Sequence, residues 1–248
     1  MNRKNVFTWI VALFVAMFCF GCSHLNNECN YLLKDGDKLA FLGDSITEGG
    51  TIHADGYCNF VMSGLKTMGL AVEPVFAGVS GNKSNDMLQR LDKDVIAYHP
   101  QWMTVSCGIN DIWHISRSCE EFRPYLEEIV RKSQEDGINL VLMTVTLFGE
   151  GEKAKNEPAI AEYNQAIYEI AKRYNCHVAD TGKALRDEIQ RLHDQGAEGD
   201  SLLTYDGIHM KREGDEVMAE TILRSFGAND EMMAKIKEDW KSIPRDRR

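Results

Sequence analysis

Short apolar runs alternate with longer amphipathic segments along most of this chain, and this alternation is the feature that most restricts its fold. Residues 139–147 are apolar at nearly every position, as expected of a strand buried on both faces of a parallel sheet. Residues 85–97 instead place Met87, Leu88 and Leu91 at helical spacing. Strands that alternate with such helices indicate βαβ units. We therefore expect an α/β fold, a three-layer α/β/α sandwich of flavodoxin-like arrangement with about five parallel strands.

The expected elements account for the chain between its two ends. The expected strands cover residues 38–42, 73–77, 102–106, 139–147 and 177–179. The expected helices cover residues 59–68, 85–97, 119–134, 159–174, 181–193 and 212–225. Because no repeat or interdomain linker interrupts the pattern, we expect one domain over residues 35–228. Residues 229–248 are expected to be a charged tail, either a solvated helix end or a disordered terminus.

The first 21 residues indicate an export signal. The basic residues Arg3 and Lys4 precede an apolar run over residues 6–20, which is shorter than the roughly 20 residues of a membrane-spanning helix. A small residue, Gly21, closes the run, as in secretory signals. We therefore expect a signal peptide over residues 1–21, and a protein outside the cytoplasm.

The cysteine that follows this signal suggests how the mature chain is held. Cys22 comes directly after Gly21 and resembles the lipidated cysteine of bacterial lipoproteins, although Cys19 stands where such signals usually have Leu. We expect Cys22 to be a lipid anchor and residues 22–34 a tether, which places the protein in the cell envelope, periplasmic or attached to the outer membrane. Ordinary cleavage and secretion is the alternative.

Charge and cysteine spacing exclude several classes of partner. The formal net charge of −10 argues against nucleic acid and anionic membranes, so we expect membrane contact only through the N-terminal anchor. The five cysteines beyond Cys22 show no metal-ligand spacing, and we expect no metal and no cofactor. One or two disulfides would be compatible with an oxidising compartment. Cys107 lies in an apolar strand pattern and is expected to be buried.

Polar segments follow the expected strands where each strand ends. They cover residues 43–45, 78–82, 108–111 and 146–149, and three of them pair glycine with a polar side chain. Because sites in open parallel sheets form at the carboxyl ends of strands, we expect these segments to build one site.

Ser45 is the candidate nucleophile, because it sits in the turn between the first strand and a helix. A serine reacts only beside a base that a third group orients. His209 follows Asp206 by three residues, a spacing that puts both side chains on one face of a turn. Asn110 offers a side-chain N–H and Gly81 a backbone N–H to a developing oxyanion. A helix cap is the alternative role for Ser45.

These segments resemble the sequence blocks of the SGNH, or GDSL-type, hydrolase superfamily. The blocks occur in the family's order as Gly43-Asp44-Ser45, Gly78-Val79-Ser80-Gly81-Asn82, Gly108-Ile109-Asn110-Asp111 and Asp206-Gly207-Ile208-His209. The resemblance implies that Ser45 is the catalytic nucleophile, that His209 is the general base and acid, and that Asp206 orients His209. It also implies an oxyanion hole formed by the N–H groups of Ser45 and Gly81 and the side chain of Asn110.

Three positions near these blocks qualify the assignment. Gly78 is the alternative to Gly81 as an oxyanion donor. Asp44 neighbours Ser45 but is expected to hydrogen-bond its own loop. Met210 stands where the family often has Pro or Leu, and we expect it to affect packing and not the reaction.

The resemblance implies a serine ester hydrolase that works through an acyl-enzyme. Because no long insertion separates the blocks, we expect an open site that removes a small acyl group, such as acetyl, from a carbohydrate or another small ester outside the cytoplasm. A lysophospholipase or thioesterase is the alternative among enzymes. A noncatalytic glycan-binding envelope lipoprotein is the alternative from another class, and the oligomeric state stays open.

Overall fold

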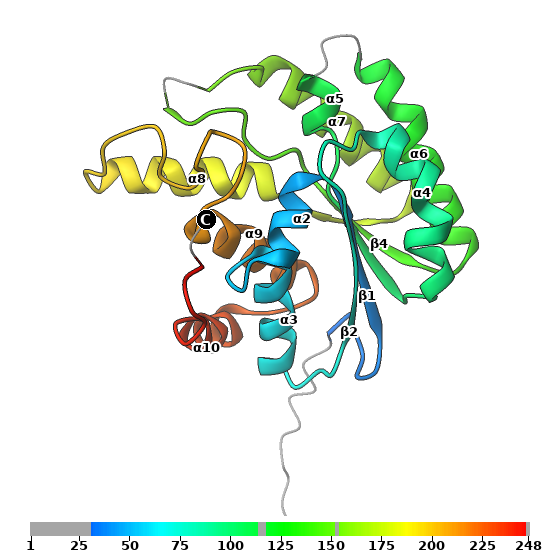
Figure 1. Ribbon diagram of the computed structural model, residues 1–248, viewed down its shortest axis with the longest axis horizontal. Coiled ribbons are helices and arrows are strands. Elements are labelled where there is room, and N and C mark those ends of the chain that lie inside the picture. Colours follow the sequence, from blue (N-terminus) through cyan, green and yellow to red (C-terminus); the bar gives the residue numbers. More distant parts are fainter. Residues whose placement is uncertain (1–30, 114–117, 152–153, 247–248) are drawn as a thin grey trace, which may run out of the picture. The chain divides into compact units, whose positions relative to one another are not determined.

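A parallel sheet of five strands forms the centre of the domain (Figure 1). The structure is a computed structural model, and it describes residues 31–113, 118–151 and 154–246. The strands are β1 (Lys38–Gly43), β2 (Glu73–Gly78), β3 (Trp102–Val105), β4 (Asn139–Met143) and β5 (His177–Ala179). They lie in the order β2-β1-β3-β4-β5, and each neighbouring pair is parallel. The central strands β1, β3 and β4 are almost wholly buried, which explains their continuous apolar character.

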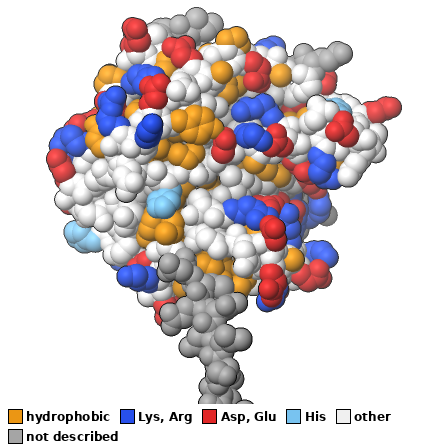
Figure 2. Space-filling model, turned by 180° about the vertical axis from the view of Figure 1, so that it is seen from behind, with side chains coloured by type: hydrophobic (Ala, Val, Ile, Leu, Met, Phe, Trp, Pro, Cys, Tyr) orange, Lys and Arg blue, Asp and Glu red, His pale blue; other side chains and the backbone are white. Residues whose placement is uncertain are grey.

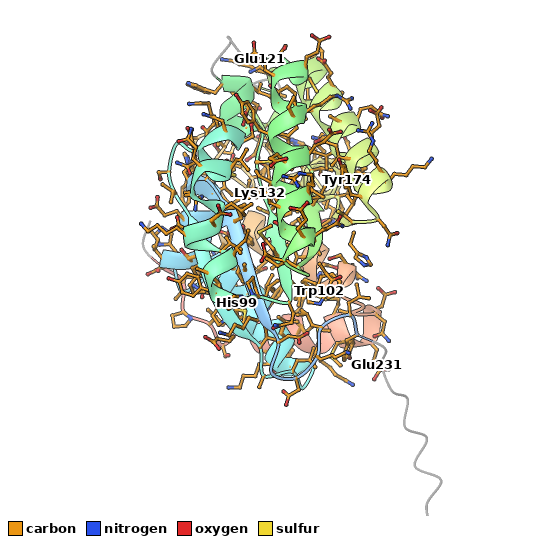
Figure 3. The ribbon with its side chains drawn as sticks, turned by 90° about the vertical axis from the view of Figure 1, so that its right-hand side faces the viewer. His99, Trp102, Glu121, Lys132, Tyr174 and Glu231 are labelled. Atoms are coloured by element: carbon orange, nitrogen blue, oxygen red, sulfur yellow. The ribbon has the colours of Figure 1, made fainter. Side chains whose placement is uncertain are left out.

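Helices cover both faces of this sheet (Figure 1), which confirms the expected three-layer α/β/α architecture. One face carries α4 (Ser84–Asp94), α6 (Cys119–Glu135) and α7 (Glu157–Tyr174). Figure 3 looks onto these helices, with Glu121 and Lys132 marking α6 and Tyr174 the end of α7. The other face carries α2 (Ser45–Ile52), α3 (Tyr57–Thr67), α8 (Thr181–Asp194) and α9 (Arg212–Ser225).

The strand order places a site between β1 and β3. From β1 the chain moves outward to β2 and then returns past β1 to β3. At such a reversal, the connections leave adjacent strand ends in opposite directions and open a crevice. Ser45 follows β1, and Asn110 lies in α5 (Ile109–Trp113) after β3. Two of the predicted site residues therefore flank this crevice.

The fourth strand is shorter than expected, although burial continues beyond its end. Strand β4 ends at Met143, although residues 144–147 are also buried. The Val145 N–H donates to the side chain of Asn164, on α7, at 2.8 Å, and so leaves the strand ladder. An apolar run in the sequence indicates that a segment is buried, but the segment is a strand only where its backbone forms the hydrogen-bond ladder of a sheet.

The C-terminal segment also differs from the expected charged tail. Residues Asp230–Trp240 form α10, and its Met233, Ile236 and Trp240 are buried. The Trp240 indole N–H donates to the Phe60 carbonyl of α3 at 3.1 Å. The charged residues of this helix face solvent, and they obscured an apolar stripe with helical spacing.

The four cysteines of the described residues are free thiols. Cys107 is buried, as expected, and Cys58 is buried beside α2. Burial raises the pKa of both thiols well above the ordinary range, so neither is an activated nucleophile. Cys29, Cys22 and the expected signal peptide lie outside the described residues, as does most of the expected tether.

Two surface properties bear on partners. On the face that Figure 2 shows, acidic and basic side chains are interspersed. Within residues 31–113, 118–151 and 154–246, no helix combines the length and the apolar character that crossing a membrane requires.

Candidate active site

Ser45 is presented by a tight turn between β1 and α2. Gly43 ends the strand, and a Cβ atom there would lie 1.9 Å from the Thr47 hydroxyl oxygen, so no larger residue fits. Asp44 caps α2 by accepting the Ile46 N–H at 2.9 Å. Ser45 is the first residue of the helix. Its own N–H therefore has no intrahelical acceptor, and it lies at the positive end of the helix dipole.

Asp44 has the structural role that we expected for it. Its side chain is 1% exposed, and this burial raises its pKa to about 7, against the lowering effects of the Ile46 N–H and of His209. The hydrogen bond to Ile46 holds the turn that carries Ser45.

A second loop, some 160 residues downstream, brings a histidine to Ser45. His209 Nε2 lies 2.9 Å from Ser45 Oγ, and His209 Nδ1 lies 2.7 Å from Asp206 Oδ2. The loop is closed by the Tyr205 N–H, which donates to the His209 carbonyl at 2.9 Å. The structure therefore aligns a hydroxyl, an imidazole and a carboxylate in the geometry of a nucleophile, a base and an orienting acid.

The Asp206 carboxylate is held in its charged form. Partial burial alone would raise its pKa, but hydrogen bonds from the His209 ring and from the N–H groups of His209 and Ile208 outweigh burial, so the pKa is lowered. The Asp206 and His209 side chains are 54% and 46% exposed. A contact this exposed contributes little to stability.

The predicted oxyanion donors approach from the second and third blocks. Asn110 Nδ2 donates to the Asn82 carbonyl at 3.0 Å, which fixes the amide and leaves its second N–H. Gly81 has φ +77°, with open space where a side chain would start. Among the described residues, its N–H makes no backbone–backbone hydrogen bond. Gly78 instead packs against α2, where a Cβ would lie 2.4 Å from the Glu48 nitrogen. Packing explains Gly78, and Gly81 stays the candidate donor.

Arg90 is a site residue that sequence reasoning missed. From α4, its guanidinium donates to the Gly43 carbonyl at 2.9 Å and to Asn82 Oδ1 at 2.6 Å, and it pairs with Asp94 at 3.3 Å. It thereby ties the nucleophile turn to the second block. On the sequence, Arg90 is one charge on the polar face of an amphipathic helix, so no local signal identifies it.

A buried carboxylate, Glu150, supports the loop that carries His209. Glu150 is 1% exposed and accepts the backbone N–H groups of residues 202–204, the shortest at 2.6 Å, together with the Thr204 hydroxyl. The Thr204 oxygen accepts the Gly207 N–H at 3.1 Å, and the Gly149 N–H donates to the Gly207 carbonyl at 2.7 Å. No local sequence signal identifies Glu150, because its partners lie over fifty residues away.

Two cavities lie beside these groups. The first, about 250 Å³, is lined by Ser45, His209, Ile52 and His53 among others. The second, about 320 Å³, lies between α5 and the loop of Asp206 and includes Trp113. Tyr205 borders both cavities, so they adjoin across the histidine loop.

We compared the described residues with the requirements of a metal site. Across residues 31–113, 118–151 and 154–246, no group of three or more His, Cys, Asp or Glu side chains is arranged to hold a metal ion.

Comparisons with known proteins identify the family of this chain. Residues 41–217 match the model of the GDSL-like lipase/acylhydrolase family. An acetylxylan esterase of Geobacillus stearothermophilus is 26% identical to this chain, and the match covers 79% of this chain and 96% of that protein.

Solved structures give the same relationship. The crystal structure of Axe2, an acetylxylan esterase of Geobacillus stearothermophilus, has a TM-score of 0.69 at 26% identity and covers 79% of this chain and 96% of its own. The acetyl xylan esterase AlAXEase has a TM-score of 0.67 at 27% identity, with 76% and 98% covered. Three Axe2 structures described as catalytic mutants replace a serine, an aspartate and a histidine by alanine, and that aspartate and histidine are three residues apart.

Proposed function

The chain belongs to the GDSL-like lipase/acylhydrolase family, and we propose that it is a serine ester hydrolase that removes acetyl groups from a carbohydrate. One observation carries the proposal: Ser45 Oγ lies 2.9 Å from His209 Nε2, while Asp206 holds the opposite ring nitrogen at 2.7 Å. If Ser45 only capped a helix, it would need neither His209 nor Asp206 beside it. This arrangement supports Ser45 as the nucleophile, His209 as the base and Asp206 as the orienting acid.

The first half-reaction forms the acyl-enzyme. His209 Nε2 takes the proton of Ser45 Oγ while the oxygen attacks the ester carbonyl carbon. The negative charge that develops on the carbonyl oxygen is stabilised by N–H donors of Ser45, Gly81 and Asn110. The bond to the alcohol oxygen then breaks, and His209 gives its proton to the departing alcohol.

The second half-reaction releases the acid. His209 takes a proton from water, and the resulting hydroxide attacks the acyl carbon. The bond to Ser45 breaks, and His209 returns the proton to Ser45 Oγ. Asp206 accepts the Nδ1–H throughout and stabilises the imidazolium that forms in each half-reaction. Its lowered pKa keeps it in the charged form that this role requires.

Acetylated carbohydrate is the substrate class that the observations favour. The relatives that match along most of this chain are acetylxylan esterases. Ser45 opens to a cavity of only about 250 Å³, and both His209 and Asp206 are about half exposed. A small acyl group attached to a bulky alcohol suits such an open site. A lysophospholipase or thioesterase, which must hold a long acyl chain, is the alternative.

The test is hydrolysis of p-nitrophenyl acetate by the purified protein. We expect Ser45→Ala and His209→Ala to abolish turnover, and Asn110→Ala to lower kcat by about 10²–10³-fold, as removal of one oxyanion donor does. Ser242→Ala and His177→Ala are matched controls on exposed residues outside the site, and both should keep the wild-type rate. Wild-type turnover by Ser45→Ala or His209→Ala would refute the assignment.

The substrate class needs its own measurement. Acetate release from acetylated xylo-oligosaccharides is compared with fatty-acid release from a lysophospholipid. Faster release from the lysophospholipid would replace the carbohydrate assignment by the lipid alternative. Glycan binding without hydrolysis of any ester would favour a noncatalytic glycan-binding lipoprotein.

Export and anchoring belong to the same proposal. The basic start, the apolar run over residues 6–20 and Gly21-Cys22 support a signal over residues 1–21 and lipidation of Cys22. A protein held in this way would meet extracellular or periplasmic glycans. Mass spectrometry of the mature N-terminus decides the point, because an unmodified terminus away from Cys22 would contradict the anchor.

A further inference from the structure

We propose that the second cavity is a glycosyl-binding subsite, in which the exposed ring of Trp113 stacks on a pyranose ring of the alcohol part of the substrate. The inference rests on the proposed esterase function and extends it from the reacting ester to the sugar that carries it. It assigns to Trp113 a binding role that the catalytic geometry alone does not require.

Trp113 is an exposed aromatic residue held in a fixed orientation. Its side chain is 54% exposed, and its ring stacks on that of Phe148 with the centroids 5.1 Å apart and the planes at 29°. Phe148 is only 8% exposed. One face of the tryptophan is therefore anchored to the core, and part of its surface stays open to the cavity. A ring ordered before binding loses little entropy when a ligand stacks on it.

The lining of the cavity combines an aromatic surface with polar edges. Trp113 and Phe148 contribute aromatic surface, and Lys155, Asp200 and Ser201 contribute polar atoms. The face of an aromatic ring carries partial negative charge, which attracts the C–H groups on one face of a pyranose, while the sugar hydroxyls need polar partners. A fatty acyl chain would bury the same polar groups without hydrogen bonds, at a cost. The mixed lining therefore favours a sugar.

The cavity lies beside the loop that carries His209. One wall is Trp113, at the end of the helix that begins beside Asn110, and the opposite wall is the loop of Asp206. His209 must deliver its proton to the alcohol oxygen, so the alcohol lies beside this loop. Because Tyr205 borders both cavities, a sugar in the second cavity adjoins an ester held at Ser45 in the first.

The experiment compares two substrates across a set of variants. For Trp113→Ala, we expect the ratio of kcat/KM on acetylated xylo-oligosaccharide to kcat/KM on p-nitrophenyl acetate to fall about tenfold, mainly through KM. Trp113→Phe keeps a smaller aromatic face and should lose less. Tyr98→Ala removes a ring that is 53% exposed and lines neither cavity, and it should leave the ratio unchanged. An unchanged ratio for Trp113→Ala would overturn the subsite.

A binding measurement separates failure of the subsite from failure of the esterase function. In a Ser45→Ala background, isothermal titration calorimetry should detect binding of deacetylated xylo-oligosaccharide, and adding Trp113→Phe should weaken that binding several-fold. This arm does not need turnover, so it tests the subsite even if no ester is hydrolysed. Equal affinity in both backgrounds would overturn the proposal, as would a selective loss of lysophospholipid hydrolysis in Trp113→Ala.

Discussion

Replacing Glu150 by glutamine should both destabilise the protein and slow its reaction. In the structure, the two carboxylate oxygens share three backbone N–H donors and the Thr204 hydroxyl. In Glu150→Gln, one oxygen becomes an NH₂ group. Whichever side the NH₂ takes, it faces the N–H of Leu202 or of Thr204, so at least one buried donor loses its acceptor.

The size of the effect follows from these contacts. A lost charge-assisted hydrogen bond costs about 1.5–3 kcal/mol, and a buried donor without an acceptor costs about 1–3 kcal/mol. The free energy of unfolding should therefore fall by roughly 2.5–6 kcal/mol. For a domain of this size, each kcal/mol lowers Tm by about 2–4 °C, so we expect a decrease of roughly 5–24 °C.

The rate of the reaction should also fall, because residues 202–204, which Glu150 holds, lead into the loop of Asp206 and His209. A displacement of about 1 Å in a catalytic group can cost roughly 10²-fold in rate. We expect kcat on p-nitrophenyl acetate to fall about 10- to 100-fold, measured well below the Tm of the variant, where the protein is still folded.

Thermal unfolding followed by circular dichroism gives Tm, and steady-state kinetics at 20 °C give kcat. Glu198→Gln is the matched control, because it makes the same chemical change at an exposed residue of the preceding loop and should change stability by less than about 0.5 kcal/mol. A Glu150→Gln protein whose Tm and kcat both match those of Glu198→Gln would refute the reasoning.

Two further predictions concern the nucleophile turn. Arg90→Lys keeps the positive charge but loses the planar guanidinium that reaches both Gly43 and Asn82. We expect kcat to fall about tenfold. An unchanged kcat would show that the turn does not need this contact. Burial raises the pKa of Asp44 from 3.8 to about 7 in the folded protein, so folding favours the neutral carboxyl. The free energy of unfolding should therefore decrease as pH rises from about 4 to about 7, by up to about 1.4 kcal/mol per pH unit. Asp44→Asn can still cap Ile46 and should flatten this part of the curve in urea unfolding, whereas an unchanged slope would contradict the assignment.

Much of the fold could be predicted from local sequence patterns. Strand β5 and helix α9 have the expected bounds, and most other elements differ by a few residues at their ends. The patterns are reliable here because apolar spacing reflects which side of each element is buried. The patterns failed at residues 144–147, which are buried but do not continue the strand, and at α10, where exposed charges masked the apolar stripe.

The residues that meet at the candidate site could also be named in advance, because each lies in a short block with its own local signal. Ser45 follows a strand and a glycine, and Asp206 precedes His209 by three residues. The structure places Ser45 Oγ 2.9 Å from His209 Nε2, although the two residues are 164 positions apart. The order of the blocks indicated this meeting, but its distance and the fit of the ring came only from the packed chain.

The sequence by itself determined the layer architecture, the family and the residues that meet at the strand ends. Tertiary structure alone decided how those residues are held, through Arg90 on the nucleophile turn and Glu150 beneath the histidine loop, and where Trp113 and Phe148 stack. The physical reason is that periodicity and blocks are properties of neighbouring residues. A buried carboxylate or guanidinium is instead defined by partners far along the chain, which become neighbours only when the chain has folded.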